Sequence, residues 1–419
     1  MKRLLPVLVA VALTAVGCAS GADRTALPKR DSAARGSTST TAGSAATSTL
    51  VWGRCENQTA AAAGLRCASL DVPLDPRRSG GPTLSLALAR KVATGPSSRR
   101  IGSLVLNPGG PGGSGIEFLA SAATQFPAEL TERFDLVSFD PRGVGESSPV
   151  RCVDDAEKDR QLSGDLSPDT PAEVAAAQRD QTVFRNGCER GQPELVRHMG
   201  TVDVAEDLDR IRAALGDERL TFVGFSYGTS IAATYATVHP DRVRALVLDG
   251  SVSPGTTQED ETLTQARGFE RTLRSFVTGC DASPSCALAP DSAAAIAAAR
   301  ASLEQDPVQV RSGAQVRTLG PDQFDIGLAT ALYDTSTWGV AASAVKNLRT
   351  TGARTLLTIG DQQSGRQSDG SYDNSADAQS MVACADSPER PTAAEAEAAA
   401  RRISAVVPGF GNSLAWSML

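Results

Sequence analysis

The feature that most constrains this chain is a glycine-serine-glycine pattern, Gly224-Phe-Ser226-Tyr-Gly228, placed between two regular elements. An apolar, β-branched run precedes it (Leu220 to Val223), and an alanine-rich pattern with helical spacing follows it (Thr229 to about Val238). A sharp strand-to-helix turn of this kind holds its central serine exposed as a nucleophile, and it needs both glycines because side chains there would clash. The pattern therefore predicts Ser226 as a catalytic nucleophile; the alternative is a glycine-rich turn with an incidental serine.

A serine nucleophile needs a base to remove its proton and an acid to orient that base. The chain has two histidines, and neither follows the serine in the order expected for this arrangement, which is serine, acid, histidine. His239 lies at the far end of the helix that Ser226 opens, more than about 10 Å away at a rise of about 1.5 Å per residue. His198 precedes a helix expected over 202–215, and we expect it to be a solvated loop residue. The sequence therefore offers no base for Ser226.

A glycine-rich loop, Pro108-Gly-Gly-Pro-Gly-Gly-Ser-Gly115, directly follows a buried strand expected over 101–107. Such a loop lets backbone N–H groups approach a reacting oxygen, so the pattern predicts an oxyanion hole made by one loop amide and the amide after the nucleophile. The candidates are Gly110 and Tyr227. A phosphate-binding loop is the alternative, but the Lys-Ser/Thr ending of a P-loop and the spacing of a dinucleotide fingerprint are both missing.

Further motifs follow two more buried strands, 134–139 and 243–248: Asp140-Pro-Arg-Gly-Val-Gly145 and Asp249-Gly-Ser. With Asn107–Gly115, Gly224–Thr229 and His239-Pro-Asp-Arg-Val243, they resemble the exported tripeptidyl-aminopeptidase branch of the proline-iminopeptidase-like α/β-hydrolases of actinobacteria. The resemblance covers roughly residues 50–419. It implies a serine exopeptidase or esterase that removes short peptides from free N-termini, with Ser226, Gly110 and Tyr227 matching the nucleophile and the oxyanion-hole positions.

The family's catalytic acid and base lie on its last two core strands, after the cap domain, and no residues of this chain match them. The simplest hypothesis is that the polypeptide is incomplete and that roughly 80–110 further residues supply two strands, two helices, the Asp and the His. On this hypothesis the last core strands are missing, and the chain as given is nearly inactive.

The N-terminus predicts export. Residues 1–17 have a basic start, a short apolar run and small residues before Cys18, which is typical of a signal peptide. Ala15-Val-Gly-Cys18 resembles a bacterial lipobox, so we expect Cys18 to carry a lipid anchor in the membrane, with plain secretion as the alternative. Residues 18–49 are rich in Ser, Thr, Ala and Gly and are interpreted as a flexible linker.

Export into an oxidising compartment predicts disulfide bonds. Eight cysteines are present, and proximity along the chain suggests Cys55–Cys67, Cys152–Cys188 and Cys280–Cys286, although spacing alone does not fix connectivity. This pairing leaves Cys384, for which a missing partner, an intermolecular bond or a free thiol are the alternatives. We expect no metal site and no cofactor, since no Cys-x₂-Cys pair occurs and histidine is scarce.

The chain divides into an α/β core over 50–255 and a helical cap or lid over 256–419, inserted after the sixth strand. The core begins with an antiparallel hairpin (66–74 and 83–91) and continues as a mostly parallel sheet with helices on both faces. From Thr256 the pattern predicts helices alone, including 293–303, 321–332, 338–348 and one opened by a capping box at Thr392-Ala-Ala-Glu395. Such a lid would exclude water and shape the substrate pocket.

The sequence is compatible with three functions. The leading one is an aminopeptidase, which must bind a protonated amine, so Asp386 and Glu117 are the candidate substrate carboxylates; capping or solvated roles are the alternatives. The second is an esterase or lipase on the same scaffold. The third is a lipid-anchored peptide-binding protein without catalysis. The net formal charge of −7 and the lack of a basic stripe argue against nucleic-acid binding.

Overall fold

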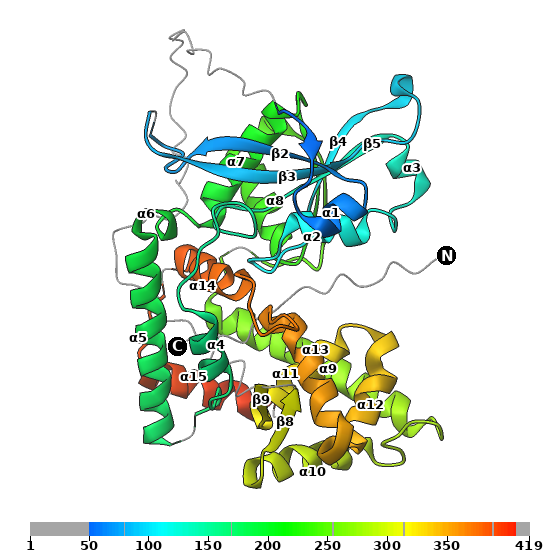
Figure 1. Ribbon diagram of the computed structural model, residues 1–419, viewed down its shortest axis with the longest axis vertical. Coiled ribbons are helices and arrows are strands. Elements are labelled where there is room, and N and C mark those ends of the chain that lie inside the picture. Colours follow the sequence, from blue (N-terminus) through cyan, green and yellow to red (C-terminus); the bar gives the residue numbers. More distant parts are fainter. Residues whose placement is uncertain are drawn as a thin grey trace.

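The computed structural model describes residues 50–407, except 79, 169, 254, 313–314 and 388. The predicted signal peptide, Cys18 and the linker up to residue 49 therefore lie outside the described residues. Figure 1 shows a sheet-containing unit in its upper half and a mostly helical unit in its lower half.

The sheet has the order β1-β2-β3-β5-β4-β6-β7. The β2–β3 hairpin is antiparallel, β3 pairs antiparallel with β5, and β5, β4, β6 and β7 are mutually parallel. The strands are β1 (Gly53–Arg54), β2 (Arg66–Pro73), β3 (Thr83–Lys91), β4 (Gly102–Asn107), β5 (Phe134–Phe139), β6 (Leu220–Phe225) and β7 (Val243–Asp249). This is the predicted mostly parallel sheet with its antiparallel first hairpin.

Helices cover both faces of this sheet, because alternate strand residues point to opposite sides. On one face Val105 and Val137 pack with α7 and α8, and on the other Leu104 and Leu136 pack with α1 and α2. The helices of this unit are α1 (Gln58–Ala62), α2 (Gly115–Ala122), α3 (Ala128–Thr131), α7 (Thr201–Ala214) and α8 (Tyr227–Val238), with 3₁₀ turns at Ser97–Arg99 and Pro240–Arg242.

The second unit has a separate apolar core, built mainly from its helices. Its elements are α9 (Gln258–Asp281), α10 (Ser292–Gln305), β8 (Val308–Ser312), β9 (Gln315–Leu319), α11 (Pro321–Leu332), α12 (Trp338–Lys346), α13 (Ala353–Ser364), α14 (Ser375–Asp386) and α15 (Ala393–Val406), with a 3₁₀ turn at Thr335–Thr337 and a π turn at Leu348–Gly352. The capping box at Thr392 and Glu395 opens α15 as predicted.

The prediction of helices alone after Thr256 is wrong at one place. Strands β8 and β9 form an antiparallel hairpin between α10 and α11. Val308 and Val310 alternate with polar residues and pack against the helical core, while Leu319 is buried in it. This period-two pattern, short as it is, is that of a half-buried strand.

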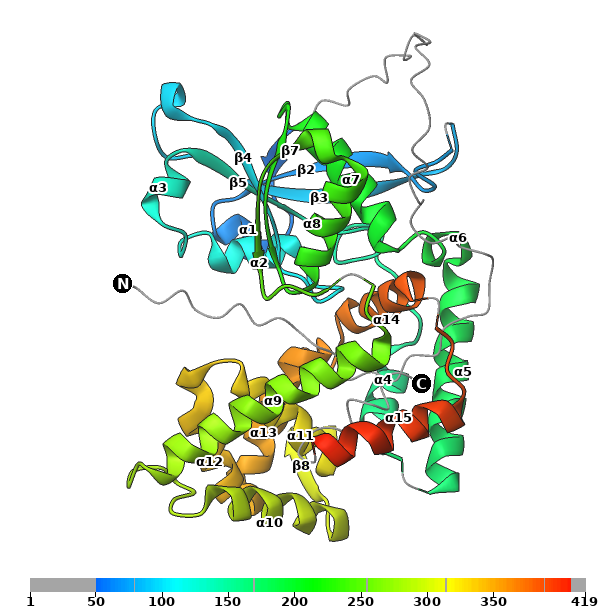
Figure 2. The same cartoon turned by 180° about the vertical axis from the view of Figure 1, so that it is seen from behind.

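The segment 149–200 forms three helices, α4 (Asp155–Leu162), α5 (Pro171–Gly191) and α6 (Pro193–Val196). Two of them contact the helical unit: Leu162 O accepts a hydrogen bond from Gln323, Asp159 pairs with Arg366, and Val174 packs on the helical core. Both views show α4 and α5 beside this unit (Figures 1 and 2). Phe184 and Cys188 of α5 pack in the core of the sheet-containing unit. The segment that the predicted division at residue 255 assigned to that core therefore contacts both units.

Three disulfides join cysteines that are near in sequence: Cys55–Cys67, Cys152–Cys188 and Cys280–Cys286. These are the pairs that sequence proximity suggested. No cysteine in the described part of the chain is free, so the free-thiol alternative for Cys384 is wrong. Among the described helices, none combines the length and the apolar character needed to cross a bilayer.

Candidate functional site

Ser226 lies at the turn between β6 and α8, as the strand-turn-helix pattern predicts. Its backbone has φ 50° and ψ −122°, a conformation that residues with a side chain rarely adopt. The Ser226 N–H donates to the carbonyl oxygen of Asp249 at the end of β7, at 2.8 Å. The serine is therefore held in a strained turn at the carboxyl ends of the parallel strands, where ligands bind in open α/β sheets.

The two glycines of the turn are required by close backbone contacts. A Cβ at Gly224 would lie 2.3 Å from the Gly228 carbonyl oxygen, and a Cβ at Gly228 would lie 2.7 Å from the Asn107 carbonyl oxygen. Real Cβ atoms do not approach backbone oxygens so closely, so α8 can pack against the ends of β4 and β6 only through glycine.

The glycine-rich loop after β4 lies against this turn. A Cβ at Gly109, where φ is +93°, would be 3.2 Å from the Ser226 Cβ and 3.0 Å from the Tyr227 nitrogen. The Gly109 N–H donates to Asn107 Oδ1 at 2.9 Å. Within the described residues the N–H groups of Gly110 and Tyr227 have no acceptor, which is what an unoccupied pair of oxyanion-hole donors requires. Gly109, which sequence reasoning did not single out, is the glycine in direct contact with the turn.

Each histidine lies near a carboxylate, and neither has a hydrogen bond to Ser226 in the described residues. The His198 ring lies 3.9 Å from an Asp203 carboxylate oxygen, and its carbonyl accepts a hydrogen bond from Arg142. The His239 ring packs on Tyr235 at the last turn of α8, with Nε2 3.4 Å from a Glu206 oxygen. Since Ser226 precedes the first turn of the same helix, His239 is at the wrong end to act as its base.

Glu117 lies in the first turn of α2, just after the glycine-rich loop, and is exposed. Desolvation by the surrounding protein raises the pKa of its carboxyl, and the negative charges of Asp373 and Glu146 raise it further. Three carboxylates from α2, the loop after β5 and the segment before α14 therefore gather beside the glycine-rich loop.

Asp386, the other candidate carboxylate, is at the end of α14. Its two oxygens accept hydrogen bonds from Thr201, one from N at 2.7 Å and one from Oγ1 at 2.5 Å. Thr201 Oγ1 lies 2.5 Å from the Tyr227 hydroxyl. The capping role considered for Asp386 thus describes its contacts at the start of α7, and sequence spacing could not reveal that Thr201 links it to Tyr227.

Asp140 ends β5 and is almost fully buried. Its oxygens accept hydrogen bonds from Ser114 Oγ at 2.7 Å, Ile116 N at 3.1 Å and Glu146 N at 2.8 Å. Burial raises the pKa of this carboxyl to about 6, although those three hydrogen bonds act in the opposite direction. Asp140 therefore joins the loop after β5 to the start of α2.

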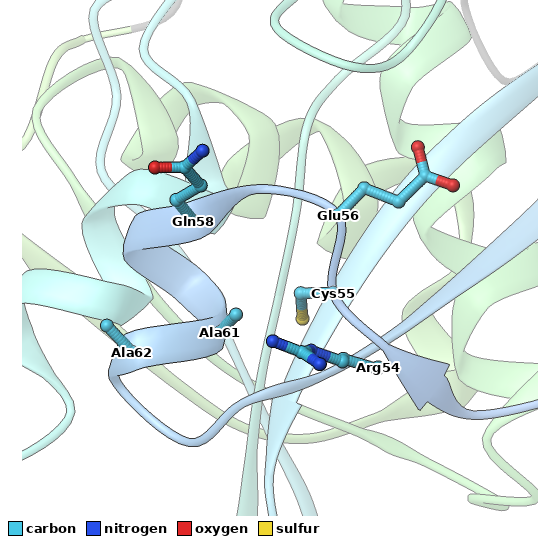
Figure 3. A pocket seen from close by; sticks show the side chains of 6 residues that line it. All are labelled: Arg54, Cys55, Glu56, Gln58, Ala61 and Ala62. Carbon is cyan, nitrogen blue, oxygen red and sulfur yellow. The ribbon is translucent and has the colours of Figure 1, made fainter.

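A surface pocket occurs at α1, lined by Arg54, Cys55, Glu56, Gln58, Ala61 and Ala62 (Figure 3). It lies at the β1–β2 edge of the sheet, whereas Ser226 follows β6, near the other edge. Cys55 is in a disulfide, so this pocket contains no nucleophile. In the described residues no group of His, Cys, Asp and Glu side chains has an arrangement that could hold a metal ion.

Comparison with known proteins agrees with the fold. A family model described as alpha/beta hydrolase fold matches residues 102–327. Serine protease Hip1 of Mycobacterium tuberculosis is 37% identical over 404 residues, which cover 93% of this chain and 74% of that protein. The chain belongs to the α/β-hydrolase family.

Two other relatives of this α/β-hydrolase have different activities in their names. Carboxylesterase B of M. tuberculosis is 33% identical over 349 residues, covering 82% of this chain and 66% of that protein. A tripeptidyl aminopeptidase of Streptomyces lividans is 41% identical over 192 residues, covering 45% of this chain and 36% of that protein. The resemblance inferred from the motifs is therefore confirmed, and this α/β-hydrolase is a serine hydrolase whose relatives include peptidases and an esterase.

Replacing Gly228 tests the close contacts of the serine turn in this α/β-hydrolase. We expect Gly228→Ala to lower the free energy of unfolding by about 1–3 kcal/mol, because the new Cβ would meet the Asn107 backbone. Gly339→Ala is the matched control: Gly339 lies in α12 with open space around its Cβ position, so it should be neutral or stabilising by up to about 1 kcal/mol. Equal effects of both substitutions in urea unfolding would contradict this account.

Asp140 should make stability depend on pH. Its pKa is about 6 in the folded protein and about 3.9 in an unfolded chain, so between these values the folded state binds more protons. The protonated Asp140 carboxyl therefore adds to the free energy of unfolding. This contribution is at most about 3 kcal/mol, is complete below about pH 4 and is lost as pH rises through about 6. The difference in unfolding free energy between wild type and Asp140→Asn should therefore shrink from pH 4 to pH 6.5.

The measurement is urea unfolding of both proteins at half-unit pH steps. Asp71→Asn, at an exposed position of β2, controls for the removal of a surface carboxylate. A difference that grows with pH over this window would mean that Asp140 loses its proton more easily in the folded protein than in the unfolded chain.

Proposed function

We propose that this α/β-hydrolase is an exported aminopeptidase that releases short peptides from free N-termini through an acyl-enzyme on Ser226. In the first step a bond forms between Ser226 Oγ and the scissile carbonyl carbon, and the peptide C–N bond then breaks. The serine proton passes through a base to the leaving amine, and water later hydrolyses the ester. The N–H groups of Gly110 and Tyr227 stabilise the oxyanion, and such a donor contributes about 10²–10³-fold to kcat.

The observation that carries the proposal is the strained backbone of Ser226, with φ at 50°, beside a glycine loop that has a free N–H. Strain of this kind persists only where surrounding contacts enforce it, and it is common at active sites. Gly109 packs directly on the turn, and Gly110 and Tyr227 then present N–H groups with no acceptor in the described part of the protein. A turn with an incidental serine would need neither arrangement.

The protonated amine of the substrate needs a negatively charged subsite. Glu117 is the better of the two predicted candidates, because Asp373 and Glu146 add negative potential around it. An ammonium group at that place would relieve the mutual repulsion of the three carboxylates. Asp386 is less suited to this role, since both of its oxygens already accept hydrogen bonds from Thr201.

The acid and base are proposed to lie on polypeptide that follows residue 419 in the native protein. Two contacts support this: His198 lies near Asp203, and His239 lies near Glu206 at the far end of α8 from Ser226. A second support is β7, which is at the edge of the sheet with Val247 and Leu248 55% and 42% exposed. An exposed apolar edge is a surface that proteins normally cover.

The proposed location is outside the cytoplasm, on the membrane, through a lipid on Cys18, with plain secretion as the alternative. The three disulfides of the described residues support an oxidising compartment.

Ser226→Ala tests the proposed chemistry in the protein purified from its own host. We expect the variant to lose at least about 10⁴-fold in kcat on a tripeptidyl anilide with a free N-terminus. The same anilide with an acetylated N-terminus should be a poor substrate, and an acyl ester should be hydrolysed less efficiently than the free-amine peptide. A preference for the ester would favour the esterase alternative, and no Ser226-dependent hydrolysis of either would favour a peptide-binding protein.

The intact mass of the non-reduced mature protein tests both the anchor and the continuation. We expect a lipid-modified Cys18 and a polypeptide about 10 kDa heavier than residues 18–419, the size of two strands with their helices. Cys18→Ser should release the protein from the membrane fraction. A mass that matches residues 18–419 would rule out the continuation, and membrane association that survives Cys18→Ser would rule out the lipid anchor.

A further inference from the structure

A chain of hydrogen bonds joins the end of α14 to the residue after the candidate nucleophile. Thr201 donates from N and Oγ1 to the Asp386 carboxylate, at 2.7 Å and 2.5 Å, and Thr201 Oγ1 lies 2.5 Å from Tyr227 Oη. A carboxylate only accepts, and a threonine hydroxyl has a single proton. Since Thr201 gives that proton to Asp386, the Tyr227 hydroxyl must donate to Thr201. The Asp386 carboxylate therefore fixes the direction of all three hydrogen bonds.

Tyr227 is partly buried. Its ring packs against the core cluster that includes α7 and α14. Burial raises the pKa of the phenol well above its usual value, and the charge of Asp386 raises it further, so the hydroxyl keeps the proton that it donates. With its side chain fixed at both the ring and the hydroxyl, Tyr227 has little freedom to move its backbone N–H.

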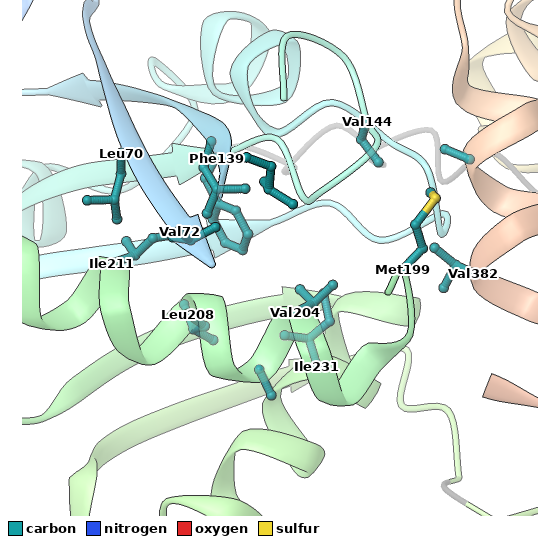
Figure 4. Packing of buried hydrophobic residues seen from close by; sticks show 14 of the residues in the cluster. Leu70, Val72, Phe139, Val144, Met199, Val204, Leu208, Ile211, Ile231 and Val382 are labelled. Carbon is teal, nitrogen blue, oxygen red and sulfur yellow. The ribbon is translucent and has the colours of Figure 1, made fainter. Parts of the chain in front are cut away.

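The other end of α14 packs on the glycine-rich loop. A Cβ at Gly112 would lie 2.2 Å from the Ser375 carbonyl oxygen and 3.0 Å from the Gln379 nitrogen, so the backbones are in direct contact. Between the two ends, Ala378, Met381 and Val382 are buried in the same core cluster, and Figure 4 shows Val382 beside Met199. One helix of the helical unit therefore contacts the segments that carry both candidate oxyanion donors.

We propose that Asp386 and Thr201 are positioning residues that hold the Tyr227 N–H in the oxyanion hole, with α14 fixing the spacing between this donor and the glycine-rich loop. The inference rests on the proposed role of Tyr227. Neither side chain touches the substrate in this account; both act on the transition state through the backbone that they hold. Asp386 therefore has a different task from the amine recognition predicted for it from sequence.

The two roles of Asp386 make opposite predictions for Asp386→Asn. An asparagine can accept from Thr201 N but must donate to Thr201 Oγ1, which reverses the hydrogen bond to Tyr227. A positioning role predicts a loss of about 10–100-fold in kcat with KM within about 3-fold, on both a free-amine tripeptidyl anilide and an uncharged acyl ester. An amine-binding role predicts a higher KM on the free-amine substrate alone.

Two further variants separate positioning from general stability. Thr201→Ser keeps the hydroxyl and should stay within about 3-fold of wild-type kcat, whereas Thr201→Val should lose as much as Asp386→Asn. Asp322→Asn is the matched control, because Asp322 likewise accepts from one backbone N–H and one hydroxyl, those of Leu166 and Ser167, within the helical unit. It should lower the melting temperature comparably but leave kcat per active site unchanged.

All variants are measured as the native polypeptide purified from its host, with active sites counted by a fluorophosphonate that labels Ser226. If wild type shows no Ser226-dependent labelling or hydrolysis, the proposed function and this inference both fail. If wild type is active and Asp386→Asn or Thr201→Val keeps kcat within about 3-fold, the positioning role alone is overturned. The positioning role is likewise overturned if Asp322→Asn lowers kcat as much as Asp386→Asn does.

Discussion

The arrangement of the sheet-containing unit depends on one buried ion pair, between Arg142 and Asp207. Both side chains are fully buried, and Arg142 donates from Nε and Nη2 to the two carboxylate oxygens at 2.7 Å. The remaining donors reach the carbonyls of Leu74, His198 and Pro73, so the guanidinium leaves no hydrogen unsatisfied. Arg142 thereby joins the loop after β5 to the β2–β3 turn, the segment before α7 and α7 itself. Breaking such a pair costs about 3–5 kcal/mol, because a buried charge is left alone.

The elements of the sheet could be predicted from sequence because their patterns are local. Buried strands such as 134–139 are continuous apolar runs between turn residues, and Pro76 to Pro82 separates the first hairpin. The contacts of α4 and α5 with the helical unit could not be predicted in this way. It depends on contacts such as Asp159–Arg366 and Lys158–Asp377, which join residues about 200 positions apart. No local pattern carries information over such a distance.

At the site, the sequence predicted the backbone better than the side chains. The turn at Ser226 and the glycine-rich loop have their own signatures, since close backbone packing requires glycine at fixed positions. The roles of Asp140, Thr201 and Asn374 have no such signature, because each depends on which segment folds against it. Asp386 illustrates the limit: its position as a carboxylate near the site was anticipated, but its hydrogen bonds to the start of α7 were not.

Asn374, just before α14, fixes the position of this helix relative to the loop after β5. Its side-chain nitrogen donates to the carbonyls of Gly143 and Val150, and its oxygen accepts from the Gly145 N–H. Rotation of the helical unit as a rigid body would leave these groups unpaired, at about 1–3 kcal/mol for each buried one. At α14 the helical unit is therefore held in place relative to the sheet-containing unit and does not open as a rigid lid. If the proposed peptidase function holds, a helix held in place beside Ser226 would limit how many substrate residues fit between them, so substrate length would be set by the resting fold and not by a closing motion.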